Sequence, residues 1–114
     1  MLLINQEFRR GVLFVRLKGS LTSKEVPYLN EEVTKLLKKL KMHNVVFNIS
    51  GLKEIDLDGV NALLNNYKMC RRLNGISMLC GGNTKIREYI NNSKVSSMYQ
   101  IKDELAALNI IRIW

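Results

Sequence analysis

The chain has 114 residues and a formal net charge of +8, with 46% hydrophobic and 25% charged residues. This composition is typical of one globular domain and excludes a disordered chain. No apolar run approaches the roughly 20 residues that a membrane-spanning helix needs, so we expect no direct membrane insertion.

The compartment is predicted from the first residues and the cysteines. The apolar start at residues 1–4 is too short for the core of a signal peptide, and Arg9 and Arg10 follow it rather than precede it. Cys70 and Cys80 do not form a closely spaced metal or redox pair, and we expect two buried thiols. The sequence therefore predicts a cytoplasmic protein without a disulfide, a metal or a cofactor.

The first elements are predicted to be a β-hairpin. Apolar residues at alternating positions of 2–8 precede the turn Arg10-Gly11, and a strand follows at 12–17. Gly19 is expected to end that strand, since glycine weakens a strand interior.

A helix is predicted after this hairpin. Thr22 and Glu25 have the spacing of a capping box, in which the Thr hydroxyl bonds forward and the Glu carboxylate reaches back. Pro27 is compatible with the first helical turn. One apolar face follows at helical spacing, formed by Val26, Leu29, Val33, Leu36, Leu37 and Leu40.

The centre of the chain contains the most informative residues, Asp56-Leu57-Asp58-Gly59. They follow a strand at 45–49, which is apolar enough to be buried on both faces, and a connection at 50–55. A helix is predicted from near Val60 to Asn74-Gly75. One carboxylate would suffice to cap this helix, so two carboxylates before a glycine suggest a site as well as a cap.

The remaining elements continue the alternation of strands and helices. We predict a strand at 76–80, a helix at 84–90, a weak strand at 98–101 and a helix at 103–108. The extension at 110–114 is apolar and β-prone, and it either folds back onto the domain or pairs with another chain. The order predicts one α/β domain over residues 1–114, with a mixed, mostly parallel sheet and helices packed on it.

Several segments in this order resemble the STAS domain, the family of sulfate transporters and anti-sigma-factor antagonists. Residues 15–22 resemble its second strand and the V-x-L-x-G-x-L segment before the first helix. Residues 45–52 resemble its central strand. Residues 55–60 stand where the family has D-S-S-G or D-S-T-G before the second helix. The resemblance covers residues 2–109.

The resemblance implies a regulatory role without enzymatic activity. In the family, the second Ser or Thr of the motif is phosphorylated by a kinase that is also the anti-sigma factor, and phosphorylation ends the binding of the two proteins. Asp58 occupies this phosphoacceptor position, and Leu57 replaces the preceding Ser. The implied binding surface consists of Ser20, Leu21, Thr22, Asp56, Leu57, Asp58 and Gly59.

Two interpretations of Asp58 stay open, a fixed negative charge at an interaction site and a simple helix cap. The implied partner is an anti-sigma factor or another kinase-like regulator. The alternatives are an ATPase of a membrane transporter, as for a transporter-associated STAS subunit, and an orphan scaffold domain in a larger assembly.

Other sites are less well supported by the sequence. The basic residues gather at predicted helix ends without interleaved aromatic residues, which favours a solvated face over nucleic-acid binding. An acidic partner and an anionic membrane surface are both compatible with the charge.

The calcium-loop pattern from Glu54 lacks a Glu at its twelfth position. For Gly81 to Thr84, a turn at the exit of a strand is favoured over a phosphate-binding site. His43 is the only histidine in the sequence, and no catalytic set can be assembled around it.

Overall fold

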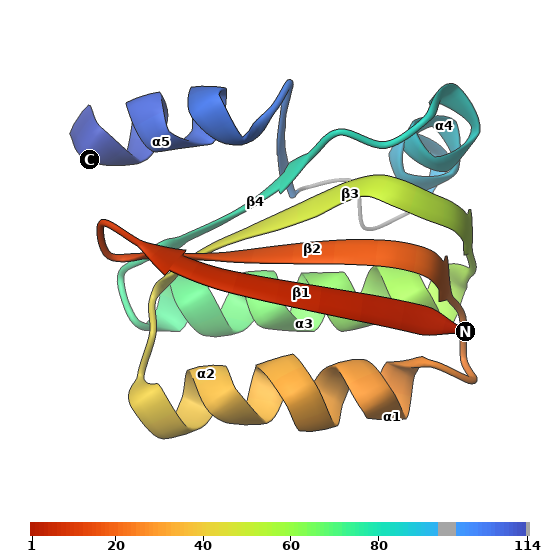
Figure 1. The fold of residues 1–114 in the computed structure, drawn as a ribbon, viewed down its shortest axis with the longest axis horizontal. Helices are drawn as coiled ribbons and strands as arrows, with labels where there is room; N and C mark the ends of the chain where they lie inside the picture. Colours follow the sequence, from red (N-terminus) through yellow and green to blue (C-terminus); the bar gives the residue numbers. More distant parts are fainter. Residues whose placement is uncertain (94–97, 114) are drawn as a thin grey trace.

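The computed structural model describes residues 1–93 and 98–113 of the chain. Its elements alternate along the chain as the sequence predicts (Figure 1). They are β1 (Leu2–Arg9), β2 (Val12–Leu21), α1 (Val26–Leu29), the π-helical segment η1 (Asn30–Thr34), α2 (Lys35–Leu40), β3 (Asn44–Ile55), α3 (Leu57–Arg72), β4 (Ile76–Cys80), α4 (Thr84–Asn92), β5 (Tyr99–Ile101) and α5 (Glu104–Ile113).

The five strands form one sheet in the order β1-β2-β3-β4-β5. β1 pairs with β2 in antiparallel fashion, and the remaining neighbours are parallel. This confirms the predicted α/β fold with a mixed, mostly parallel sheet. The hairpin turn is also confirmed, since Arg10 and Gly11 both have positive φ values, 52° and 80°, which suit the tight turn of a two-residue hairpin.

The two central strands are longer than predicted. β2 continues past Gly19 to Leu21, and β3 continues past Ile49 to Ile55. Gly19 therefore does not end the strand. It has a φ of 101° next to a register shift in the pairing with β3, which makes it part of a bulge. The extensions pair with each other, and Leu21 lies opposite Ile55 at their ends.

Both faces of the sheet are covered. One core lies between the sheet and the helices α1 to α4, and it includes Phe47. A second core includes Phe14 and Val46 and is covered by Ala107 and Leu108 of α5. Figure 1 shows α5 on the opposite side of the sheet from α1, α2 and α3. The prediction that the central strand is buried on both faces is confirmed.

The C-terminal extension does not form a separate β-prone segment. Residues 110–113 continue α5, and Ile110 and Ile111 pack against the second core. Their apolar side chains follow Ala107 and Leu108 at helical spacing, so the helix extends the contact that they begin. Trp114 lies outside the described residues. Within the described part of the chain, no helix is long and apolar enough to cross a membrane.

The first predicted helix is one helical rod, α1-η1-α2, with a π-helical segment in its middle. Val33 and Leu37 are fully buried under it, as predicted. Leu40 was expected on the same face but is 57% exposed. The wider π segment rotates the last turn relative to an uninterrupted α-helix, which explains the displaced position.

The two cysteines are buried and free. Burial raises the pKa of Cys70 to about 11, and burial together with nearby carboxylates raises the pKa of Cys80 to about 12. Both thiols are therefore protonated and unreactive at neutral pH.

A polar network fixes the start of α5 on the sheet. The guanidinium of Arg16 donates two hydrogen bonds of 2.9 Å to Glu104, and it also donates to Asn5 and Glu7 of β1. The amide of Asn48 on β3 donates to Glu104 at 2.8 Å. The bond from Arg16 holds the pKa of Glu104 below its usual range. One carboxylate thereby connects α5 to β2 and β3.

This network predicts an acid-sensitive part of the stability. Glu104→Gln should lower the free energy of unfolding by about 1–2 kcal/mol at pH 7, the scale of a partly exposed, charge-assisted pair. Because the pKa of Glu104 is lowered on folding, its contribution is present above its unfolded value near pH 4.5 and is lost as the pH falls through the folded value. Urea unfolding should show a smaller difference between wild type and variant at pH 3 than at pH 7.

Glu88→Gln on α4 is the matched control, because Glu88 is an exposed carboxylate outside this network. An equal loss at both pH values for Glu104→Gln would contradict the assignment of the effect to its ionised form.

Candidate functional site

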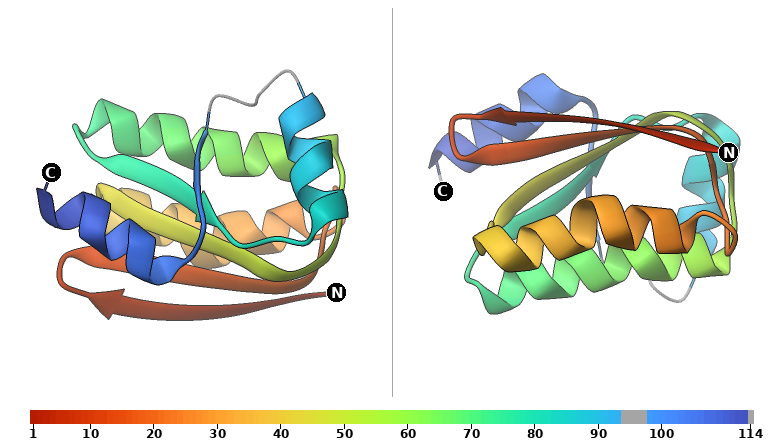
Figure 2. Two further views of the ribbon diagram at one scale, coloured as in Figure 1. Left: turned by 90° about the horizontal axis from the view of Figure 1, so that it is seen from above. Right: turned by 60° about the horizontal axis from the view of Figure 1, so that its bottom comes forward.

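The seven predicted site residues come together at one end of the sheet, where β2 and β3 end side by side. Leu21 and Ile55 are paired there, and the N–H of Asp56 donates to the carbonyl oxygen of Leu21 at 3.4 Å. The loop from Thr22 to Glu25 and the start of α3 leave the sheet from these two strand ends. Figure 2 shows α1 and α3 starting at the same end and running in the same direction. In parallel α/β sheets, this carboxyl end of the strands is where binding sites form.

Asp56 is the helix cap. Its Oδ1 accepts a hydrogen bond of 2.9 Å from the N–H of Gly59, and its Oδ2 accepts one of 2.9 Å from the N–H of Ser23. The helix therefore begins at Leu57 rather than near Val60. One carboxylate satisfies a free N–H of the helix start and also ties the loop after β2 to α3.

Asp58 is the second residue of α3, and its side chain is exposed as predicted. Among the described residues it has no hydrogen-bond or ion-pair partner, and the cap that it could have provided is provided by Asp56. The interpretation of Asp58 as the helix cap is therefore wrong. Its carboxylate stands free at the positive end of the helix dipole.

Gly59 and Leu21 shape the site from below. Both are buried, and a Cβ on Gly59 would collide with the carbonyl oxygen of Leu21. The glycine therefore allows the helix to approach the end of β2 closely. Leu57, in contrast, is 53% exposed, although it is a large apolar residue at the start of a helix.

The predicted capping box before α1 is confirmed in one of its two bonds. The carboxylate of Glu25 reaches back and accepts a hydrogen bond of 2.9 Å from the N–H of Thr22. The Thr22 hydroxyl donates to the same carboxylate at 2.7 Å instead of bonding forward. Both bonds hold the pKa of Glu25 below its usual range. Ser20 and Thr22 are half-buried beside this turn.

Sequence reasoning missed the polar residues that continue the site along α3. A shallow cavity of about 310 Å³ lies between α1 and α3, and Asp58, Asn61 and Asn65 line it from α3. These three residues repeat at spacings of three and four, which places them on one helix face. In the sequence, this polar repeat was the signal from which the continuation of the site along α3 could have been predicted.

The calcium-loop alternative does not fit the geometry. Glu54 lies within β3, Asp56 uses both oxygens for backbone N–H groups, and Asp58 lies within α3. The three carboxylates therefore do not form an ion-binding loop.

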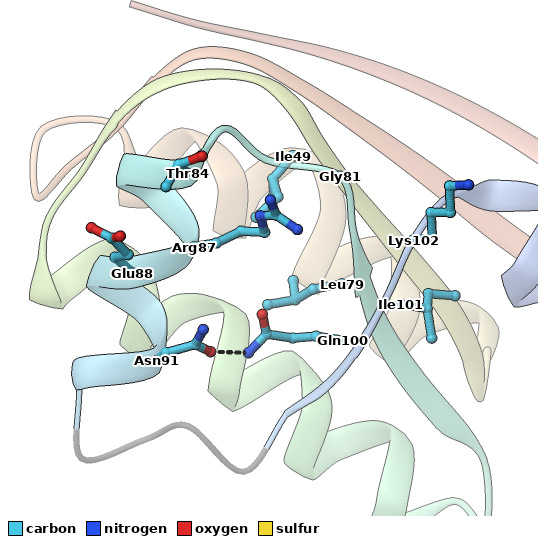
Figure 3. Close-up of a pocket in the computed structure, with 10 residues that line it drawn as sticks. All are labelled: Ile49, Leu79, Gly81, Thr84, Arg87, Glu88, Asn91, Gln100, Ile101 and Lys102. Carbon is cyan, nitrogen blue, oxygen red and sulfur yellow. Dashed lines mark hydrogen bonds between the residues drawn. The ribbon is translucent and has the colours of Figure 1, made fainter.

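A larger cavity of about 540 Å³ lies at the other sheet edge, between α4 and β5 (Figure 3). It is the location of the weaker phosphate-site alternative at Gly81 to Thr84. Asn83 caps α4 and accepts a 2.8 Å hydrogen bond from the N–H of Ile86, so this donor at the helix start is already used. Gly81 and Gly82 have φ values of 77° and 90°, which fit the sharp exit from β4. The segment acts as a strand exit and a helix cap.

The two aspartates should differ in their effect on stability. Asp56→Ala should lower the free energy of unfolding by about 1–2 kcal/mol, because two backbone N–H groups lose their acceptor. Asp58→Ala should change it by less than about 0.5 kcal/mol, the scale of an exposed charge near a helix terminus. Thermal or urea unfolding of both variants tests this, and equal losses would contradict the assignment of the cap to Asp56.

Comparisons with known proteins agree with this fold. An anti-sigma F factor antagonist of Paenibacillus polymyxa is 25% identical over 111 residues, which cover 96% of this chain and 95% of that protein. The anti-sigma factor antagonist SpoIIAA in its unphosphorylated form has the same fold, with a TM-score of 0.76, 17% identity and coverage of 96% and 98% of the two chains.

A transporter also contains this fold. The murine anion transporter Solute Carrier 26 family member A9 matches with a TM-score of 0.72 and 15% identity, over 95% of this chain and 19% of the transporter. The sequence profile of the STAS domain matches residues 4–108 of the chain. The chain therefore belongs to the STAS domain family.

Proposed function

We propose that the chain is a regulatory module of the anti-sigma-factor antagonist type, and that it binds a kinase-like anti-sigma factor in the cytoplasm through the surface around the start of α3. The single observation that carries this proposal is the free, exposed carboxylate of Asp58 at the position where the family has its phosphorylated Ser or Thr. The Paenibacillus relative, which aligns over nearly its whole length, supports the same class of function.

The separation of roles between the two aspartates supports a binding function for Asp58. Asp56 meets the needs of folding at the junction. A second carboxylate in the first turn adds only a small dipole interaction to stability. Its exposed position, with no partner among the described residues, fits a contact with a partner more closely than it fits a structural need.

The charge of Asp58 also defines what regulation is possible. A phosphorylated Ser would carry about 1.5 to 2 negative charges at pH 7, whereas a carboxylate carries one and cannot be removed by a phosphatase. The proposed interaction site therefore has a fixed charge between that of an unmodified Ser and that of a phosphorylated Ser. It would be insensitive to the kinase at this position.

Leu57 gives the proposed surface an apolar centre. Its side chain is 53% exposed beside Asp58, and a partner that covers it would remove this apolar surface from water. The adjoining end of β2 and the loop after it contain Ser20, Thr22 and Ser23, which would supply polar groups for the rim of the contact. The N–H of Ser23 donates to Asp56, next to Leu57.

Asp58→Ser tests the fixed charge. We expect the affinity for the anti-sigma factor kinase from the same cells to change by about 1–3 kcal/mol in titration calorimetry, the scale of a charge-assisted contact at an interface. The variant should also accept phosphate from that kinase and ATP, since it regains a hydroxyl. Glu88→Ser on α4 is the control for the loss of an exposed carboxylate.

Three results would overturn this proposal. They are an unchanged affinity for Asp58→Ser, an equal change for Glu88→Ser, and binding of a transporter ATPase in place of the kinase. The last result would favour the second candidate function, a transporter-associated subunit, for which the shared fold of the murine anion transporter is the supporting observation.

Leu57→Ala tests the apolar centre. It should weaken binding of the same kinase by about 1–2 kcal/mol, because a buried leucine contact is lost from the interface. Leu105→Ala on α5 is the matched control, since Leu105 is 67% exposed on the opposite side of the sheet. Similar losses for both variants in the same calorimetric titration would refute a central role for Leu57.

A further inference from the structure

A groove runs between the rod α1-η1-α2 and the helix α3, which lie side by side in Figure 2. Its wider part has a volume of about 550 Å³ and lies beside α2 and the second half of α3. Four cations line it, Lys35 and Lys38 from the rod and Lys68 and Arg72 from α3. The predicted site at Asp58 does not account for this concentration of positive charge.

Three of these cations are unpaired within the part of the chain that the structure describes. Among the described residues, Lys38, Lys68 and Arg72 form neither a hydrogen bond nor an ion pair with another side chain. Only Lys35 is paired, at 3.3 Å from Glu31 one turn earlier on the same rod. The walls of the groove therefore carry about three uncompensated positive charges. Lys68 lies before the last turn of α3, so compensation of the helix dipole does not account for it.

A polar contact connects the two helices beside the groove. The hydroxyl of Thr34, which lines the groove, donates at 3.1 Å to Oδ1 of the fully buried Asn66, and Nδ2 of Asn66 donates to the carbonyl oxygen of Ala62 at 2.8 Å. Thr34 is the last residue of the π-helical segment. A buried polar contact between the two walls sets their spacing, and a π segment often marks a functional position in a helix.

The groove is continuous with the surface around Asp58. The shallower cavity of about 310 Å³ that contains Asp58 shares Pro27, Asn30 and Asn65 with the wider part. One channel therefore begins at a free carboxylate and ends at three free cations. Its two ends carry opposite charge.

We propose that this groove is a second docking surface of the chain and binds an acidic segment of a partner protein, with the acidic side chains at Lys38, Lys68 and Arg72. The inference rests on the proposed function only in that the partner is a protein. It extends the proposed contact from the start of α3 along the length of this helix. Complementary charge at such a surface gives orientation and faster association.

The shape and charge of the groove favour a peptide over the other polyanions. A nucleic acid is negative along its whole length and would meet the carboxylates of Glu31 and Asp58, which line the same channel. A bilayer surface is flat and would contact raised cations rather than cations on the walls of a groove. A peptide segment can carry acidic residues at one end only.

The test uses the full, isotope-labelled chain and a synthetic 12-residue peptide that has acidic residues in one half and neutral polar residues in the other. Amide shifts should change around Lys38, Lys68 and Arg72 during an NMR titration. Lys38→Gln/Lys68→Gln should weaken binding about fivefold, the scale of losing two exposed charge contacts. The matched control Lys53→Gln/Lys85→Gln removes the same charge from another surface and should change binding less than twofold.

The orientation of the peptide gives a second measurement. A nitroxide label on the acidic end should broaden amide signals near Lys68 and Arg72, and a label on the other end should broaden those near Asp58. Thermal unfolding of both double variants verifies that the fold is intact.

Four results would overturn the proposal. They are equal weakening in the two double variants, no preferred peptide orientation, tighter groove-dependent binding of a 12-nucleotide single-stranded DNA, and tighter groove-dependent binding of phosphatidylserine vesicles. The experiment needs no kinase, so its failure leaves the Asp58→Ser test of the proposed function unaffected, and the reverse also holds.

Discussion

The site depends on one carboxylate that binds two segments of the chain. Asp56 accepts hydrogen bonds from Gly59 at the start of α3 and from Ser23 in the loop after β2. The parallel pairing of Leu21 with Ile55 brings these two segments together, and the missing side chain of Gly59 lets the helix approach the strand end. Because the loop and the helix start share one acceptor, the surface above them is held in one geometry before any partner binds.

This arrangement separates folding from binding at neighbouring positions. The side chains that satisfy backbone groups, Asp56 and Glu25, are half-buried and fully used. The two side chains that follow Asp56, Leu57 and Asp58, are exposed, and Asp58 has no partner among the described residues. The proposed interface would use these two exposed side chains, one apolar and one charged.

Two groups of charges, one paired within the domain and one unpaired among the described residues, lie on opposite sides of the sheet. On the α5 side, Arg16 and Glu104 pair with each other and Asn48 also donates to Glu104, so these charges serve the packing of a helix onto the sheet. On the α3 side, Lys38, Lys68 and Arg72 have no partner among the described residues. Much of the net positive charge is thus available to molecules outside the domain, and the location of its free part decides which face they approach.

The sequence by itself determined the order of the elements, the hairpin at Arg10-Gly11, the backward reach of Glu25 and the position of the aspartate pair, because each depends on residues close together in the chain. Only the tertiary structure decided the length of β3, since residues 50–55 are held by β2 and not by their own pattern. It also assigned the cap to Asp56, because the choice between two aspartates depends on where β3 ends against β2 and the helix begins. The apolar residues Ile110 and Ile111 became helical because a second core receives them. The groove, finally, needs two helices at a fixed spacing, which no single segment encodes.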